Sequence, residues 1–142
     1  MSAQSPSTRS QAALDAIAVK VELASGNIPV LLHEIRHALA RLLHEGASTC
    51  IDVKRIPLAP GEEERLVEWL GKGEVRAQLA ALGSSEVTET AFTGVWLVSH
   101  CDDAGALQAR FIEVTHVPDI LRAQHSDMTD SLARLTARLA TQ

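Results

Sequence analysis

The spacing of the apolar residues changes along this chain, and that change restricts the fold more than any other feature. Between residues 28 and 42 the apolar side chains recur every three or four positions, which is the period of an α-helix. From residue 74 to residue 114 they recur mainly at every second position, which is the period of a β-strand. Separate blocks of the two periods predict a single α+β domain in which helices pack on a sheet.

The first helix is predicted between Gly26 and Gly46, two residues that favour helix ends. Pro29 lies in its first turn, where a proline costs little because the N–H that it lacks would be unpaired there. The apolar stripe of this helix comprises Ile28, Leu31, Leu32, Ile35, Ala38, Leu39 and Leu42.

Two further helices are predicted. Glu62, Glu63 and Glu64 begin the second helix, where the helix dipole favours negative charge, and Gly71 ends it. Ser126 is the expected cap of the third helix. The expected buried face of the second helix is Leu66, Trp69 and Leu70, and the apolar stripe of the third is Met128, Leu132, Leu135 and Leu139.

The remaining segments predict a mixed or antiparallel sheet of about four to five strands. Residues 95–99 and 107–114 are expected to form a hairpin, because Asp102–Gly105 between them is a good turn sequence. Consecutive hairpin strands favour antiparallel pairing. The other predicted strand segments are residues 49–56, 75–79 and 86–90.

The length of 142 residues corresponds to one domain. Residues 1–25 are expected to be a flexible or partly ordered N-terminal segment, and residues 26–142 the domain itself. Within the first segment, residues 12–24 fit the helical and the strand period, and the choice between them stays open.

Charge and composition exclude several classes of partner and location. The net charge is −5, no basic run occurs and aromatic residues make up 3%, so a nucleic-acid partner is not expected. No apolar run reaches the roughly 18 residues of a membrane span, and the first eleven residues lack the apolar stretch of a secretory signal. A cytoplasmic location without membrane insertion is therefore expected, with Cys50 and Cys101 as reduced thiols.

The segment His33-Glu34-Ile35-Arg36-His37 has the H-E-x-x-H spacing of zinc proteases, in which two imidazoles bind zinc and the Glu is the general base. However, helical geometry places His33 and His37 opposite the apolar stripe, as on a solvated or partner-facing surface. A third ligand at a usual spacing is also missing. A metal- or cluster-handling protein that uses His33 and His37 remains an alternative, and a zinc hydrolase is a weaker one.

An ordered series of short motifs resembles one family, the hydrogenase expression/formation proteins called HupH or HyaF. The resemblance covers residues 26 to 127, about the C-terminal region of that family, so this chain is expected to be a short, single-domain member. The motifs are Leu31-Leu32-His33-Glu34-Ile35, Ile51-Asp52-Val53, Ile56-Pro57-Leu58, Leu70-Gly71-Lys72-Gly73-Glu74-Val75, Glu86-Val87-Thr88-Glu89-Thr90, Gly94-Val95-Trp96, Phe111-Ile112-Glu113-Val114 and Pro118-Asp119-Ile120-Leu121.

The resemblance implies an accessory protein without enzymatic activity or cofactor that acts in the maturation of a nickel–iron uptake hydrogenase. Its expected partners are a hydrogenase subunit precursor, first of all the iron–sulfur small subunit, and other maturation factors. Such a chaperone needs exposed apolar features, and aromatic anchors often dominate the energy of an interface. Self-association as a homodimer, through the sheet edge or a terminal helix, is a further expectation. The expected partner-binding residues are Phe92, Trp96, Pro118 and Ile120, with Glu89 and Glu113 as an acidic rim; the alternative for Trp96 is a place in the core.

Overall fold

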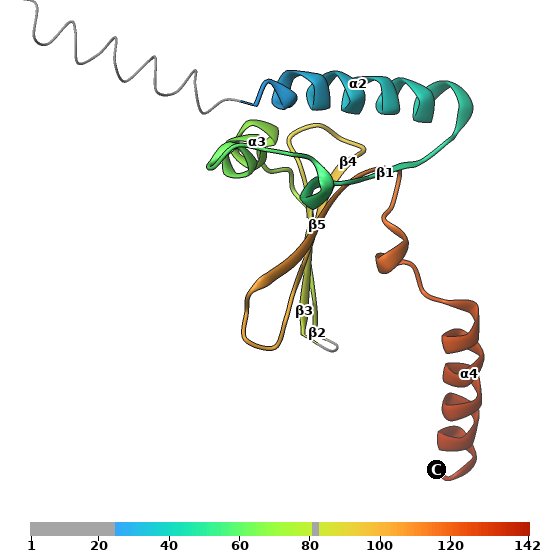
Figure 1. Cartoon of the computed structure of the whole chain (residues 1–142). Coiled ribbons are helices and arrows are strands. Elements are labelled where there is room, and N and C mark those ends of the chain that lie inside the picture. The colour runs from blue at the N-terminus through green and yellow to red at the C-terminus, as the bar shows by residue number, and fades with distance from the viewer. Residues whose placement is uncertain (1–24, 81–82) are drawn as a thin grey trace, which may run out of the picture.

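The structure is a computed structural model that describes residues 25–80 and 83–142. The predicted N-terminal segment, including the undecided stretch 12–24, lies outside these residues except for Ser25. Figure 1 shows the arrangement of the described elements. In chain order they are α2 (Asn27–Glu45), β1 (Thr49–Asp52), the 3-10 turn η1 (Val53–Arg55), α3 (Glu62–Leu70), β2 (Arg76–Ala80), β3 (Ser84–Glu89), β4 (Val95–Cys101), β5 (Leu107–Val114), the 3-10 turn η2 (Asp119–Leu121) and α4 (His125–Ala140).

The strands form one antiparallel sheet in the order β1-β5-β4-β3-β2, which confirms the predicted α+β fold. The predicted hairpin between β4 and β5 is also present. Its turn is fixed by Asp102, whose carboxylate accepts the backbone N–H groups of Ala104 and Ala106, each at 2.9 Å. The Asp102 side chain thus supplies acceptors for backbone N–H groups in the turn, where the hydrogen bonds between the two strands end.

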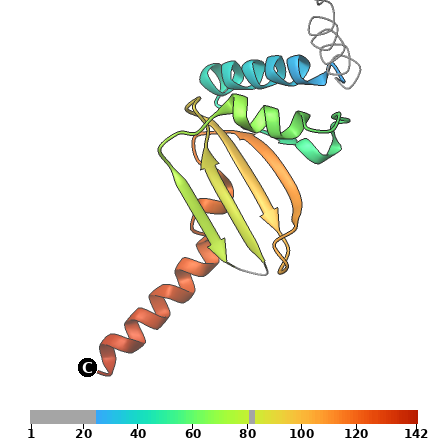
Figure 2. The ribbon, with the colours of Figure 1, turned by 90° about the vertical axis from the view of Figure 1, so that its left-hand side faces the viewer.

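Helices α2 and α3 pack on one face of the sheet, over one end of its strands (Figure 2). The predicted stripe of α2 has a buried residue in each turn from Leu31 to Leu42 and packs onto alternate residues of the strands. Burial of this apolar surface is the main stabilising contribution to the fold. The buried residues of this core are Leu31, Ile35, Ala38, Leu42, Ile51, Val53, Leu66, Leu70, Val95, Leu97, Ile112 and Val114.

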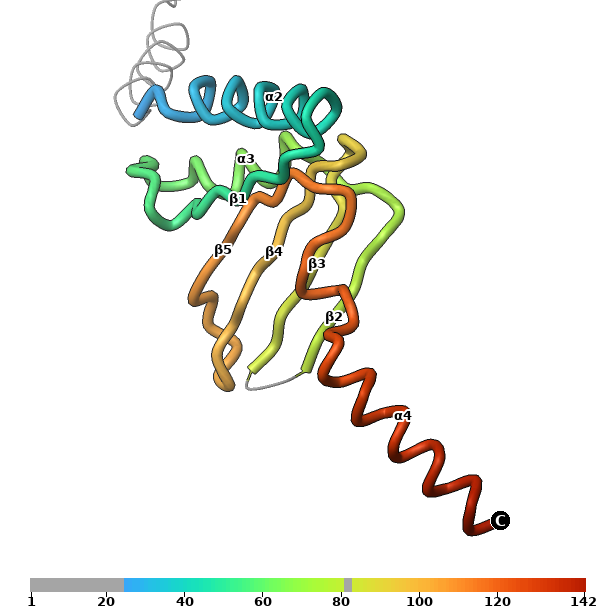
Figure 3. The backbone as a smooth tube through the Cα atoms, turned by 90° about the vertical axis from the view of Figure 1, so that its right-hand side faces the viewer, coloured from blue at the N-terminus to red at the C-terminus, as the bar shows by residue number. Residues whose placement is uncertain are grey.

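A smaller cluster lies on the opposite face of the sheet. Val87, Trp96 and Val98 are buried there, and Leu121 packs against them. The chain after β5 passes over this face before α4 begins (Figure 3). Within it Pro118 is almost fully buried, and the Trp96 indole Nε1–H donates to the Thr115 carbonyl at 3.1 Å. Trp96 therefore occupies the core, the alternative that the sequence left open.

Two predicted boundaries are wrong. The strand expected over residues 49–56 ends at Asp52, because the Asp52 carboxylate accepts the Lys54 N–H at 3.1 Å and turns the chain into η1. Ser126 does not cap the last helix, since α4 already begins at His125 with Gln124 at the cap position. The strand thus ends earlier, and the helix begins earlier, than the local pattern indicates.

Trp69 was predicted on the buried face of α3, and this prediction is also wrong. Trp69 is 58% exposed, whereas Leu66 and Leu70 are each 1% exposed. Trp69 lies on the flank of α3, where no other element covers it fully. No helix among residues 25–80 and 83–142 is long and apolar enough to cross a membrane.

Candidate functional site

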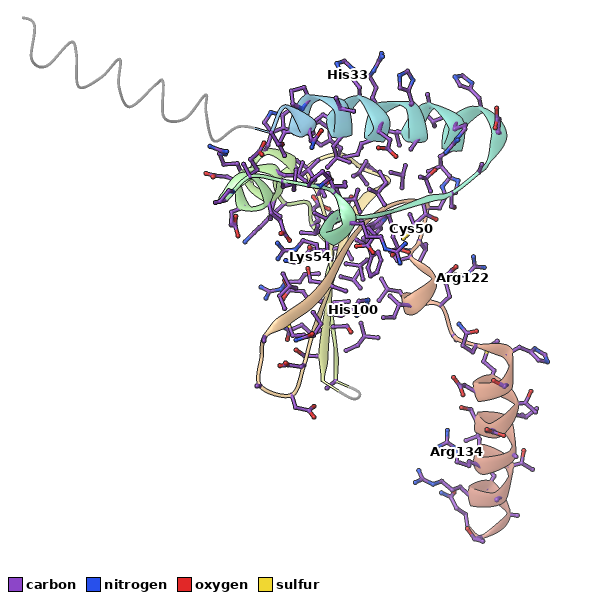
Figure 4. All side chains as sticks on the ribbon, viewed as in Figure 1. His33, Cys50, Lys54, His100, Arg122 and Arg134 are labelled. Carbon is purple, nitrogen blue, oxygen red and sulfur yellow. The ribbon has the colours of Figure 1, made fainter. Side chains whose placement is uncertain are left out.

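The H-E-x-x-H segment lies on the exposed side of α2. His33 and His37 are both exposed, and Figure 4 shows His33 on the side of α2 that faces away from the sheet. In the part of the chain that the structure describes, no three His, Cys, Asp or Glu side chains lie close enough together to hold a metal ion. The pair therefore forms a surface feature, and residues 25–80 and 83–142 supply no third ligand to it.

An apolar groove of about 390 Å³ opens between α2, α3 and the loop that joins β3 to β4. On one side of it the rings of Trp69 and Phe92 are stacked, with centroids 5.5 Å apart and an angle of 18° between the planes. Both residues remain exposed, by 58% and 44%. The lining residues of this apolar groove are Leu32, His33, Ile35, Arg36, Leu39, Trp69, Leu70, Phe92 and Val95.

The loop that carries Phe92 is held by one buried hydroxyl. The Thr90 Oγ1–H donates to the Val95 carbonyl at 2.8 Å, and the same oxygen accepts the Phe92 N–H at 3.2 Å. The Ala91 N–H in turn donates to the Leu70 carbonyl at 2.9 Å, which joins the loop to the end of α3. These backbone contacts hold the loop that carries Phe92 beside the end of α3 that carries Trp69.

Gly94 completes this loop in a conformation that few other residues adopt, with φ +92°. A Cβ at this position would lie 3.2 Å from the Leu39 Cδ1 atom of α2. Glycine therefore allows the loop to approach α2 closely.

The ionisable residues that line the apolar groove are both basic. Among its lining residues, only Arg36 and His33 carry a basic side chain, and none is acidic. The apolar floor and the basic rim together fit a segment that presents apolar side chains and a neighbouring carboxylate.

Three of the predicted partner-binding residues lie on the other face of the sheet. Glu89, Trp96, Glu113 and Cys50 are direct neighbours across β3, β4, β5 and β1, and we call them the Trp96 row. Trp96 is 8% exposed, so mainly its carboxylate neighbours are open to a partner. The structure therefore separates the predicted set: Phe92 lies at the apolar groove, and Glu89, Trp96 and Glu113 lie in the Trp96 row.

The other two predicted residues belong to the chain after β5. Pro118 is buried, whereas Ile120 is 39% exposed on η2. Ile120 thus remains available to a partner, while Pro118 supports the cluster around Trp96.

Burial raises the pKa of the Glu113 carboxyl, and the charge of Asp119 raises it further, while His100 acts in the opposite direction. Burial also raises the pKa of the Cys50 thiol, to which Glu113 and Asp52 contribute. A thiol with a raised pKa keeps its proton at neutral pH and is a poor nucleophile. The Trp96 row therefore lacks an activated cysteine.

A second hollow, of about 930 Å³, lies beside α3 on the same face of the sheet and is lined by polar and apolar residues. At its edge Arg110 forms an ion pair with Glu63 at 3.2 Å and bonds to the Ser99 hydroxyl at 3.2 Å. These contacts use the Nε–H group and one Nη1–H group of Arg110 and hold its guanidinium group between Glu63 and Ser99.

Sequence reasoning missed the role of Glu62 and the exposure of Trp69. Glu62 is 3% exposed, and its Oε1 atom accepts the N–H groups of Ala59, at 2.6 Å, and Ser25, at 3.0 Å. Hydrogen bonds to Ser25 and then to Ala59 lower the pKa of this carboxyl. The three consecutive glutamates were a signal for a helix start, but only the fold shows which of them is enclosed.

Comparison with known proteins agrees with the motif series. The family model of the HupH hydrogenase expression protein, C-terminal conserved region, matches residues 26–142. The chain is similar to the solved structure of the hydrogenase expression protein HupH from Thiobacillus denitrificans, with 41% identity and a TM-score of 0.79 over 84% of this chain and 99% of that chain.

Curated relatives are similar as well. The hydrogenase expression/formation protein HoxQ of Azotobacter vinelandii is 29% identical over 109 residues, which cover 75% of this chain and 38% of the relative. HupH of Rhodobacter capsulatus is 32% identical over 112 residues, which cover 77% of this chain and 39% of the relative. The chain thus spans about two fifths of the length of these relatives. By the family model and the solved structure, this chain belongs to the HupH hydrogenase expression protein family.

Proposed function

We propose that this chain is an accessory protein of nickel–iron hydrogenase maturation and acts as an assembly chaperone, not as an enzyme. In this proposal it binds a hydrogenase subunit precursor in the cytoplasm, first of all the iron–sulfur small subunit. The names of its relatives support a role in hydrogenase maturation, and the apolar groove supports binding of a precursor segment. The exposed, stacked pair of Trp69 and Phe92 is the observation that carries the proposal.

A chaperone must bind an incompletely folded chain and release it again. An aromatic pair that is already stacked suits this task, because the Trp69 and Phe92 rings lose less side-chain freedom when the partner arrives, which reduces the cost of association. Trp is also among the residues that contribute most to interface energy. The small size of the apolar groove limits the contact to a short segment, so the complex can dissociate.

The basic rim of the apolar groove fixes how the bound segment is oriented. Arg36 would pair with a carboxylate beside the apolar residues of the bound segment, and His33 lies next to it along the groove. Of the partner-binding residues predicted from the sequence, Phe92 is the one that would contact the segment bound in the apolar groove. Glu89, Glu113 and Ile120 would contact a second part of the precursor, while Trp96 and Pro118 support the surface from inside.

The test is affinity capture from cells that express a hydrogenase operon, with the precursor quantified against the bait. Wild type is expected to retain the small-subunit precursor. Trp69→Ala with Phe92→Ala is expected to lose most of it, and Arg36→Glu part of it. Leu43→Ala is the matched control, because Leu43 is a 75% exposed apolar residue of α2 outside the apolar groove.

The outcomes separate the two parts of the proposal. If wild type retains no hydrogenase subunit, the proposed function is wrong. If wild type and the Trp69/Phe92 double variant retain the precursor equally, the function stands but the apolar groove is not its binding site.

A further inference from the structure

Among the described α-helices, α4 alone has no buried residue. It extends away from the sheet and from α2 and α3 (Figures 1 and 2). Its apolar side chains are nevertheless large: Met128, Leu132, Leu135 and Leu139 are between 50% and 67% exposed. An amphipathic helix of this kind usually obtains its stability from packing of the apolar face.

The spacing of these four residues is that of a coiled-coil seam. The intervals between them are four, three and four positions, which is the alternation of a and d residues in a heptad. At 100° per residue they fall within about 60° of one another, in a stripe about 16 Å long. A stripe this narrow suits one facing helix, whereas a helix that lies on a sheet needs a wider apolar face.

We propose that α4 is a dimerisation element, and that two copies of this chain associate through an antiparallel pair of α4 helices. In this arrangement Leu132 of one copy packs on Leu135 of the second copy, and Met128 packs on Leu139. The two-fold axis passes between the two central layers, so each contact occurs twice.

The charges of α4 select the antiparallel orientation. Its first half carries Asp127 and Asp130, and its second half carries Arg134 and Arg138. In the proposed register Asp127 and Arg138 of the second copy lie on the same flank of the pair, offset by about 3 Å along the axis. A parallel pair would align the two helix dipoles and place like-charged ends together.

Other occupants of this seam fit less well. The apolar groove has a basic rim at Arg36, and the flank of α4 beside its seam carries Arg138 as well as Asp127, so charge does not favour this pairing. A membrane surface favours helices with an excess of basic residues and with aromatic side chains on the apolar face. Helix α4 has two Arg against two Asp, and its seam contains no aromatic residue.

The first experiment measures the mass of the full chain by sedimentation equilibrium over a concentration range of about 1 to 500 μM. Wild type is expected to convert from monomer to dimer within this range, since four layers make a short seam. Leu135→Glu is expected to raise the dissociation constant at least about a hundredfold, because it places two carboxylates in the central layers. Ala137→Glu, on the opposite side of α4, is the matched control and is expected to change it little.

The second experiment tests the orientation by charge reversal. Asp127→Arg and Arg138→Asp are each expected to raise the dissociation constant on the order of tenfold, and their combination is expected to restore it. Circular dichroism verifies that each variant keeps its helix content. A wild-type chain that stays monomeric throughout, or a dimer that Leu135→Glu leaves intact, would overturn the proposal. A double variant no tighter than the single ones would overturn the antiparallel register.

Discussion

Removal of the Thr90 hydroxyl tests how the apolar groove is built. In Thr90→Val the shape of the side chain is kept, but the hydroxyl that joins Val95 and Phe92 is lost. Thr90 is 2% exposed, so water cannot readily replace these two hydrogen bonds. At about 1 kcal/mol for each bond, with a further cost for the unpaired Phe92 N–H, we expect a loss of about 2–3 kcal/mol in the free energy of unfolding.

The assay is urea unfolding followed by tryptophan fluorescence, together with the melting temperature. A loss of this size corresponds to a decrease of about 6–12 °C for a domain of this length. Because the hydroxyl also fixes Phe92, we expect weaker capture of the hydrogenase precursor even at temperatures at which the variant is folded.

Thr88→Val is the control. The Thr88 hydroxyl contacts only the Leu97 carbonyl, at 3.4 Å, so its loss is expected to cost less than about 1 kcal/mol. Equal destabilisation by the two substitutions would refute the assignment of a special role to Thr90. So would a Thr90→Val variant with unchanged stability and unchanged precursor binding.

Three further predictions concern single residues, each measured by urea unfolding. Glu62→Gln lowers the free energy of unfolding at pH 7, because the lowered pKa of Glu62 stabilises the native state above pH 4.5. The difference from wild type shrinks as the pH falls through the lowered pKa. A difference that does not depend on pH would contradict this prediction. Glu113→Gln is expected to have the opposite pH dependence. The raised pKa of Glu113 stabilises the native state fully below pH 4.5, and this contribution is lost as the pH rises through the raised pKa. The variant therefore gains stability relative to wild type between pH 4 and pH 7, and an unchanged difference would contradict this prediction. Gly94→Ala costs about 1–2 kcal/mol, since its φ of +92° and the nearby Leu39 Cδ1 both oppose a Cβ, whereas Gly105→Ala, with open space around it, should lose only the φ contribution.

Local sequence patterns were sufficient to predict α2 and the β4–β5 hairpin. Leu31, Ile35 and Leu42 repeat at the period of one helix, and Asp102 stands at the turn that it closes, so each signal is complete within a few residues. The early end of β1 was missed because a single side-chain contact, from Asp52 to the Lys54 N–H, competes with the strand pattern.

The apolar groove could not be predicted because its parts come from distant segments. Trp69 was assigned to the core from the apolar stripe of α3, but whether the flank of a helix is covered depends on the helix packed beside it. Phe92 was recognised as a candidate contact, yet only the β3–β4 loop brings it onto Trp69. The apolar stripe of α4 was likewise visible in the sequence, whereas its separation from the rest of the domain was not.

The most direct test of the central claim is a photo-crosslink formed in cells that express a hydrogenase operon. A photoreactive phenylalanine analogue replaces Phe92 in one strain and Leu43, on the same domain but outside the apolar groove, in another. We predict a crosslink from position 92 to the hydrogenase small-subunit precursor and none from position 43. No crosslink from position 92 to any hydrogenase subunit, or equal crosslinks from both positions, would contradict the claim that the chain acts by holding a precursor in the apolar groove.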